Sequence, residues 1–211
     1  CLSKGSVNNA VKIKDRLTFS PEIVTLPEVT QAIKEGMIKR LSDGNVNDAI
    51  IVKDQFLVAT DVISSPEVQQ SAKKGIVKQL SKGNIGDAVQ IRDKFLLNAD
   101  VAQDAAREGM QLLLLEGRSF DNAIKIKDQF SLSKEIVLQA AADAMSSLLS
   151  KGSFESAIKI KDQFQLSVDE TAKAAKHAFL KCLADEKKEM AEKIKEKFRV
   201  SVNSEEILGF F

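Results

Sequence analysis

A cation followed directly by an acid recurs six times in this chain, and this pair is the strongest candidate for chemistry. The cations are Lys14, Lys53, Arg92, Lys127, Lys161 and Lys195. In one interpretation, each cationic stem packs along an apolar core, and its charge reaches helix carbonyls or an acid of an adjacent unit, which forms a salt-bridge ladder. In the other, the cations line one groove and bind phosphates or an acidic peptide.

The residues most often used in catalysis are scarce. The single histidine, His177, has no nucleophile or carboxylate at a motif spacing, so we expect a surface or packed side chain rather than an acid–base catalyst. The two cysteines, Cys1 and Cys182, lie far apart without metal-ligand spacing, and they predict neither a disulfide framework nor a zinc site. We therefore predict a protein that is not an enzyme, with no metal and no cofactor.

The charge balance bears on partner and compartment. The chain has 31 Lys and Arg against 30 Asp and Glu, which argues against a strongly basic nucleic-acid binder but leaves room for a local basic stripe. No apolar run approaches the roughly 18 residues that span a bilayer, and the start has no signal-peptide pattern. We expect a soluble protein in a reducing intracellular compartment, cytoplasmic by default, with no membrane partner.

The cation–acid pairs recur because the whole sequence is repetitive. Copies aligned on one alanine are separated by 39, 39, 35, 34 and 34 residues, a period typical of stacked helical units. An apolar residue stands three positions after each alanine, and a Phe or Leu stands seven positions after it. These spacings place the residues on one helix face. Each repeat therefore contains a short helix, helix B, that carries the pair. The anchor alanines are Ala10, Ala49, Ala88, Ala123, Ala157 and Ala191.

A longer segment, helix A, precedes each later helix B. Its start carries capping residues: Ser65 before Pro66, and Ser167 with Glu170 in the reciprocal Ser-x-x-Glu form. Its end is marked by a glycine that can take the left-handed conformation. These glycines are Gly44, Gly83, Gly117 and Gly152. We predict five complete A helices and six B helices, with loops absorbing about five extra residues in the first two linkers.

One strip of helix A is made of small residues. A small residue is followed four positions later by glycine or alanine, at Gly36, Gly75, Gly109, Ala144 and Ala178. Because a glycine within a helix costs roughly 1 kcal/mol relative to alanine, its use at equivalent places predicts a very close neighbouring helix. We interpret the strip as the contact between stacked units.

The junction between helix A and helix B resembles that of a known repeat family. The segments Lys82–Ile91 and Lys151–Ile160 have the Gly-x-hydrophobic-x-x-Ala-hydrophobic pattern of pentatricopeptide repeats and, more loosely, of tetratricopeptide repeats. The resemblance covers about 190 residues. It implies an all-α, right-handed α-solenoid of antiparallel helix pairs. We expect residues 1–211 to form one such domain, cut from a longer array, because Leu2–Gly5 matches Leu80–Gly83.

The resemblance also points to candidate binding positions. Pentatricopeptide proteins read single-stranded RNA with a residue early in helix A. The matching residues here are mostly charged: Glu35, Lys74, Glu108 or Gly109, Asp143 and His177. These residues carry charges of both signs, and solenoids offer a concave surface. We therefore expect a non-enzymatic scaffold that binds a protein or peptide segment at these helix A positions. The alternative is RNA binding, with the Lys/Arg column contacting phosphates. The partner's identity and the oligomeric state stay open.

Overall fold

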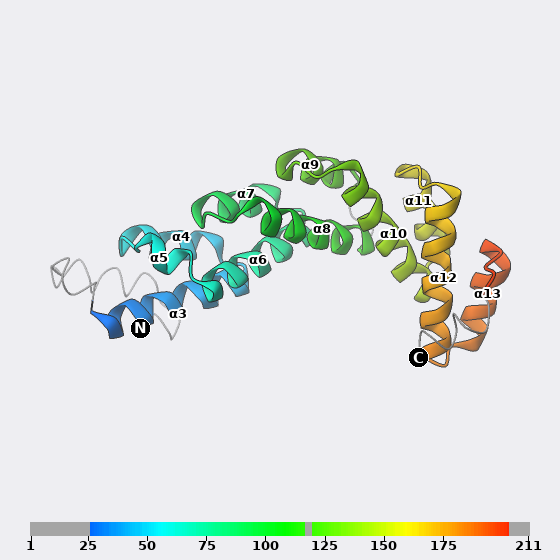
Figure 1. The fold of residues 1–211 in the computed structure, drawn as a ribbon, viewed down its shortest axis with the longest axis horizontal. Coiled ribbons are helices and arrows are strands. Elements are labelled where there is room, and N and C mark those ends of the chain that lie inside the picture. Colours follow the sequence, from blue (N-terminus) through cyan, green and yellow to red (C-terminus); the bar gives the residue numbers. More distant parts are fainter. Residues whose placement is uncertain (1–25, 117–119, 203–211) are drawn as a thin grey trace. The chain divides into compact units, whose positions relative to one another are not determined.

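The described part of the chain is helical throughout. The computed structural model describes residues 26–116 and 120–202, and no strand occurs within these two ranges (Figure 1). The predicted A helices are α3 (Pro27–Asp43), α6 (Pro66–Ser81), α8 (Ala99–Leu115), α10 (Lys134–Ser150) and α12 (Val168–Ala184). The predicted B helices are α4 (Val46–Gln55), α7 (Ile85–Lys94), α9 (Phe120–Phe130), α11 (Phe154–Gln163) and α13 (Lys188–Phe198). The all-α prediction is confirmed, and the B helix expected around Ala10 lies outside the described residues.

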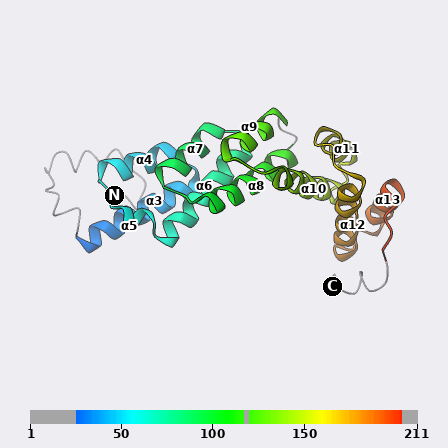
Figure 2. The ribbon, with the colours of Figure 1, turned by 45° about the horizontal axis from the view of Figure 1, so that its top comes forward.

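The helices belong to two compact units, Cys1–Gly109 and Met110–Phe211. In the first unit α6 packs on both α3 and α7, and α3 also packs on α4. In the second unit α10 packs on α11 and α12, and α12 packs on α13 (Figure 2). Each A helix in these sets thus contacts its own B helix, which is consistent with helical repeats. The right-handed solenoid of antiparallel pairs over residues 1–211 stays a prediction.

The repeated columns of helix B form its buried face. All five described anchor alanines are at most 1% exposed, and so are the aliphatic residues three positions later. Fully burying a Val or Ile side chain stabilises a fold by about 1.5–3 kcal/mol. The predicted core face is therefore correct for these members: Ala49, Ala88, Ala123, Ala157 and Ala191, with Val52, Ile91, Ile126, Ile160 and Ile194.

The predicted starts and ends of helix A are present. Glu170 N donates to Ser167 Oγ at 3.2 Å, and Ser167 N donates to Glu170 Oε2 at 2.7 Å, which completes the capping box of α12. Pro66 opens α6 as expected, but the Ser65 side chain forms no capping hydrogen bond, so the predicted cap of this helix is wrong. Left-handed glycines follow α3, α6 and α10 at Gly44, Gly83 and Gly152, whereas Gly117 lies outside the described residues. After α12 the same conformation is taken by Glu186.

Two features of the chain were not predicted. Every described B helix is followed by a non-glycine residue with φ between 46° and 53°: Leu57, Leu96, Ser131, Gln165 and Arg199. The backbone N–H of the residue after this one then donates to the backbone carbonyl of the cation in the recurring cation–acid pair, as Leu97 N does to Arg92 O at 3.1 Å. In addition, the second linker contains a short helix, α5 (Thr60–Ile63), where a loop was expected.

The small-residue strip is a close helix contact, as predicted. A Cβ on Gly75 of α6 would lie 2.8 Å from the Leu41 carbonyl oxygen of α3. A Cβ on Gly109 of α8 would lie 2.6 Å from Leu80 Cβ of α6. Real Cβ atoms essentially never come this near to other atoms. Glycine at these positions therefore allows the A helices of the first unit to approach each other.

Candidate functional site

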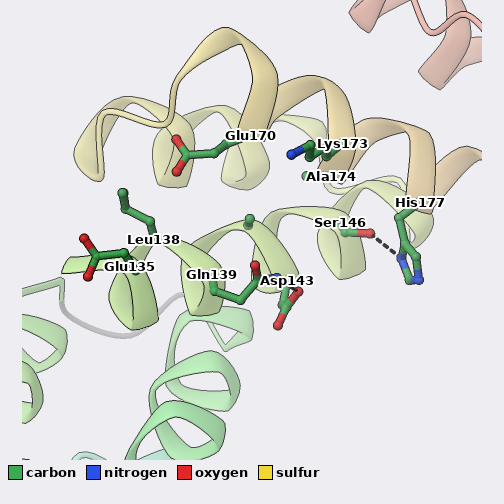
Figure 3. A pocket seen from close by; sticks show the side chains of 10 residues that line it. Glu135, Leu138, Gln139, Asp143, Ser146, Glu170, Lys173, Ala174 and His177 are labelled. Carbon is green, nitrogen blue, oxygen red and sulfur yellow. Dashed lines mark hydrogen bonds between the residues drawn. The ribbon is translucent and has the colours of Figure 1, made fainter. Parts of the chain in front are cut away.

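An open depression of the second unit lies between α10 and α12. We call it the α10–α12 groove, an open cavity of about 550 Å³. Figure 3 shows α10 and α12 contributing side chains from both sides. Its polar lining comprises Glu135, Gln139, Asp143 and Ser146 from α10, with Glu170, Lys173 and His177 from α12. Leu138, Ala142 and Ala174 add apolar surface.

Local structure fixes both walls of this groove. Serines cap both helices: Ser133 Oγ accepts from Ile136 N at 3.3 Å at the start of α10, and Ser167 does the same for α12. Ala144 and Ala178, from the small-residue strip, are fully buried. These small side chains pack inside while their polar neighbours flank the opening. The groove is thus built on regular helices, which position side chains more firmly than loops do.

The structure brings together two of the predicted binding residues, Asp143 and His177. Both line the α10–α12 groove, and Gln139 Nε2 donates to Asp143 Oδ1 at 2.8 Å. His177 Nδ1 lies 3.0 Å from Ser146 Oγ, and the two side chains point toward each other in Figure 3. Ser146 was missed from the sequence because this contact joins residues 31 positions apart on different helices.

The groove is acidic. Its lining presents the carboxylates of Glu135, Asp143 and Glu170 and one ammonium, Lys173, while the nearby Lys134 ammonium also acts on Glu135 and Glu170. Hydrogen bonds from the backbone N–H and then the hydroxyl of Ser167 lower the pKa of Glu170. A backbone hydrogen bond, followed by the Ser133 hydroxyl, lowers the pKa of Glu135 in the same way. Both carboxylates therefore stay ionised at neutral pH, and the groove attracts cations.

The Ser146–His177 contact invites comparison with a nucleophile–base pair. Ser146 lies inside α10, where backbone N–H groups donate to carbonyls one turn earlier in the chain. Acyl transfer needs free donors for a developing oxyanion, and a helix interior supplies none. We interpret the contact as a polar link between α10 and α12. In the two described ranges, no group of three or more His, Cys, Asp or Glu residues could hold a metal ion.

The other predicted binding residues lie elsewhere. Glu35 on α3, Lys74 on α6 and Glu108 on α8 are all exposed, and they belong to the first unit rather than to the α10–α12 groove. The lysine directly before Glu35 and the lysine directly before Lys74 each form an ion pair with the next A helix. Lys34 Nζ lies 3.0 Å from Glu67 Oε2, and Lys73 donates to Asp104. Sequence reasoning missed these bridges, although the lysines occupy one repeat position.

The same repeat position explains why the second unit has a groove. Lys34, Lys73 and Ala142 all stand 15 residues before their anchor alanines, and Glu67 and Glu170 both stand 21 before theirs. In the first unit a lysine therefore spans from one A helix to the next. On α10 of the second unit the equivalent side chain is a methyl group, and both Ala142 and Glu170 line the groove. The absence of a lysine at this position leaves the space open, and Glu170, which also accepts from Ser167 N in the capping box of α12, lines it without an ion pair to α10.

Four described members of the cation column form ion pairs within their own helices. These ion pairs are Lys53–Asp54 at 2.9 Å, Arg92–Asp93 at 2.7 Å, Lys161–Asp162 at 2.9 Å and Lys195–Glu192 at 4.0 Å. The ladder interpretation expected helix carbonyls or an acid of an adjacent unit, whereas these partners are in the same helix. The pairs are solvent-exposed, so each contributes about 0–1 kcal/mol. Lys127 lines a separate pocket, and Lys14 lies outside the described residues.

Within residues 26–116 and 120–202, no helix combines the length and the apolar character that crossing a membrane requires. Comparisons of the chain with family models, with curated proteins and with solved structures find no significant match, so the resemblance to pentatricopeptide and tetratricopeptide repeats stays an expectation.

Proposed function

We propose that this chain is a non-enzymatic binding module whose α10–α12 groove holds a basic segment of a partner protein. The observation that carries the proposal is the acidic lining of a groove between two capped helices. The wider expectation, a right-handed solenoid of antiparallel helix pairs with helix A on the concave side, belongs to the same proposal. Its support is the recurrence of the same caps and buried columns in successive repeats.

Arginine or lysine is the side chain that this groove suits best. A volume of about 550 Å³ accommodates one or two long side chains but not a folded domain. The apolar surface of Leu138, Ala142 and Ala174 can cover a methylene stem. Carboxylates at Asp143 and Glu170 can then accept hydrogen bonds from the cationic head, and a guanidinium can engage a carboxylate through two parallel bonds.

Single-stranded RNA has less support. Phosphates would meet three carboxylates in the α10–α12 groove, an unfavourable contact of like charges. The Lys/Arg column offers positive charge, yet Lys53, Arg92 and Lys161 each already bond to the acid that follows. A phosphate would have to replace those partners.

Fluorescence polarisation of the full chain with labelled probes tests the proposal. The probes are acetyl-Gly-Arg-Ala-Arg-Gly-amide, the same peptide with glutamate in place of arginine, and oligouridine. We expect only the arginine peptide to bind, and we expect Asp143→Asn and Glu170→Gln each to weaken it several-fold. Glutamine keeps the capping position of α12 functional, so the second variant should retain the fold. Glu35→Gln, which changes an exposed acid of the first unit, is the matched control.

A further variant tests the origin of the groove. Ala142→Lys restores the lysine found at the equivalent positions of α3 and α6, and its ammonium can reach Glu170 as Lys34 reaches Glu67. We expect this variant to fold normally and to lose the arginine peptide at least tenfold. Binding of oligouridine with a steep salt dependence, unchanged by Asp143→Asn, would instead support RNA and refute the peptide groove.

A further inference from the structure

We propose that a second pocket in the same unit, formed by α9, α10 and α11, binds a bulky apolar side chain flanked by a carboxylate. We call it the anchor pocket, lined chiefly by Phe120, Ile124, Lys127, Lys134, Val137 and Phe164. The inference deepens the proposed function and rests on it, because both sites are assigned to one segment of the partner protein. That segment would be bipolar, with its basic part in the α10–α12 groove.

The anchor pocket has the size and lining for one apolar side chain. Its volume is about 210 Å³, below the roughly 300–1,000 Å³ of sites for drug-sized molecules. Phe120 and Phe164 meet edge to face, with ring centroids 6.0 Å apart and planes at 61°. Ile124 at its edge is 56% exposed, a large apolar surface left in water. Covering it with a Phe or Leu side chain is favourable because apolar area leaves water.

The charges around the anchor pocket select for an acid. Two ammonium groups, Lys127 and Lys134, line it, and its lining contains no carboxylate. Lys127 is also the exception in its column. Lys53, Arg92 and Lys161 bond to the acid that follows them, whereas the Lys127 ammonium has no ion pair with any residue of the described ranges, although Asp128 follows it. Its charge is available to a ligand.

The two sites adjoin. Leu138 of α10 lines both the anchor pocket and the α10–α12 groove, so a short extended segment can reach from one to the other. Their charges are opposite: ammonium groups flank the anchor pocket, and carboxylates dominate the groove. A segment lying across Leu138 is therefore oriented, with its apolar and acidic end at α9 and its basic end at α12. A detached fatty acid is a poorer occupant, since its chain exceeds a pocket for one side chain.

Methyl-resolved NMR of the full chain tests the anchor pocket directly. The probe is acetyl-Phe-Glu-amide, and its amide counterpart is acetyl-Phe-Gln-amide. We expect the first to cause saturable shifts of the Ile124 and Val137 methyl signals. We expect the second to bind about threefold more weakly, which corresponds to the worth of an exposed charge contact. Lys127→Gln should weaken the glutamate probe by about the same factor and remove its advantage, whereas Lys161→Gln should leave binding unchanged.

The single histidine separates this inference from the proposed function. His177 lies in the α10–α12 groove and does not line the anchor pocket, so its ring signals distinguish occupation of the two sites. Acetyl-Arg-Ala-Arg-amide should shift the His177 signals, and acetyl-Phe-Glu-amide should not. Absence of Ile124 and Val137 shifts at millimolar glutamate probe, or equal affinity for the glutamate and glutamine probes, overturns the anchor pocket. Absence of a His177 response to the arginine probe refutes the groove and leaves the anchor pocket to be judged on its own methyl shifts.

Discussion

Replacing Gly75 with alanine tests whether close helix approach, rather than helix propensity, determines the stability of the first unit. Alanine is favoured over glycine in a helix interior by about 1 kcal/mol, so propensity alone predicts a more stable protein. The new Cβ would, however, lie 2.8 Å from the Leu41 carbonyl oxygen and 3.1 Å from Ile91 Cδ1. The first obstacle is backbone of α3, which cannot rotate away.

The sign of the effect follows from comparing the two contributions. Inserting a methylene or methyl into a packed contact typically costs 1–3 kcal/mol, because backbone or side chains must shift. At Gly75 the helix must move as a body, so we place the cost at the upper end of that range. After subtracting the propensity gain, Gly75→Ala should destabilise the protein by about 1–2 kcal/mol.

Gly86→Ala is the matched control. This residue lies in the first turn of α7, and a Cβ there would meet nothing within 4 Å. The substitution should therefore stabilise the protein, by up to about 1 kcal/mol. Urea unfolding followed by far-ultraviolet circular dichroism measures both variants, with the slope of the transition checked for constancy. A Gly75→Ala variant as stable as the wild type, with an unchanged slope, would show that α3 and α6 are not held at this distance.

Three other substitutions or reactions test single features of the structure. Leu96→Gly should raise the free energy of unfolding by about 1 kcal/mol in urea titrations, because glycine takes φ 53° without the steric cost that leucine carries. The hydrogen bond from Lys73 lowers the pKa of Asp104, so its stabilisation exists above the unfolded-state pKa of about 3.9 and is lost as pH falls through the lower folded-state value. Asp104→Asn should therefore be less stable than the wild type by about 0.5 kcal/mol at neutral pH, a difference that vanishes in strong acid. Burial raises the pKa of the Cys182 thiol, so in a Cys1→Ser background iodoacetamide should label the native protein far more slowly than the urea-unfolded protein.

The sequence predicted the helices well because their main determinants repeat. Ala88 and Ile91 lie on one face of a short helix, and every described copy of that pair is buried. The left-handed residues after helix B were missed for a physical reason. Leu57 and Leu96 carry no glycine signal, and the conformation is imposed by the next residue, exemplified by Leu97, whose apolar side chain is 9% exposed. A recurring apolar residue nine positions after each anchor was the available signal.

The candidate sites were only partly predictable. Asp143 and His177 were identified because they share one repeat position, and the fold does place both in one groove. Their partners could not be predicted in the same way. The contact between Ser146 and His177, like that between Lys73 and Asp104, joins helices whose relative rotation depends on packing at positions such as Gly109. Side-chain pairing across helices follows from that rotation rather than from spacing along the chain.

The two proposed sites share one origin: each lies where a repeat departs from its neighbours. Equivalent positions of a repeat have equivalent surroundings, so a changed side chain removes a contact that its neighbours make. Ala142 replaces a lysine, which opens the α10–α12 groove and leaves Glu170 facing it. Lys127 keeps the column cation but lacks the ion pair formed by Lys53, and its charge faces an apolar pocket instead. The conserved geometry of the helices thus supplies the framework, and the exceptions to the repeat supply the recognition chemistry.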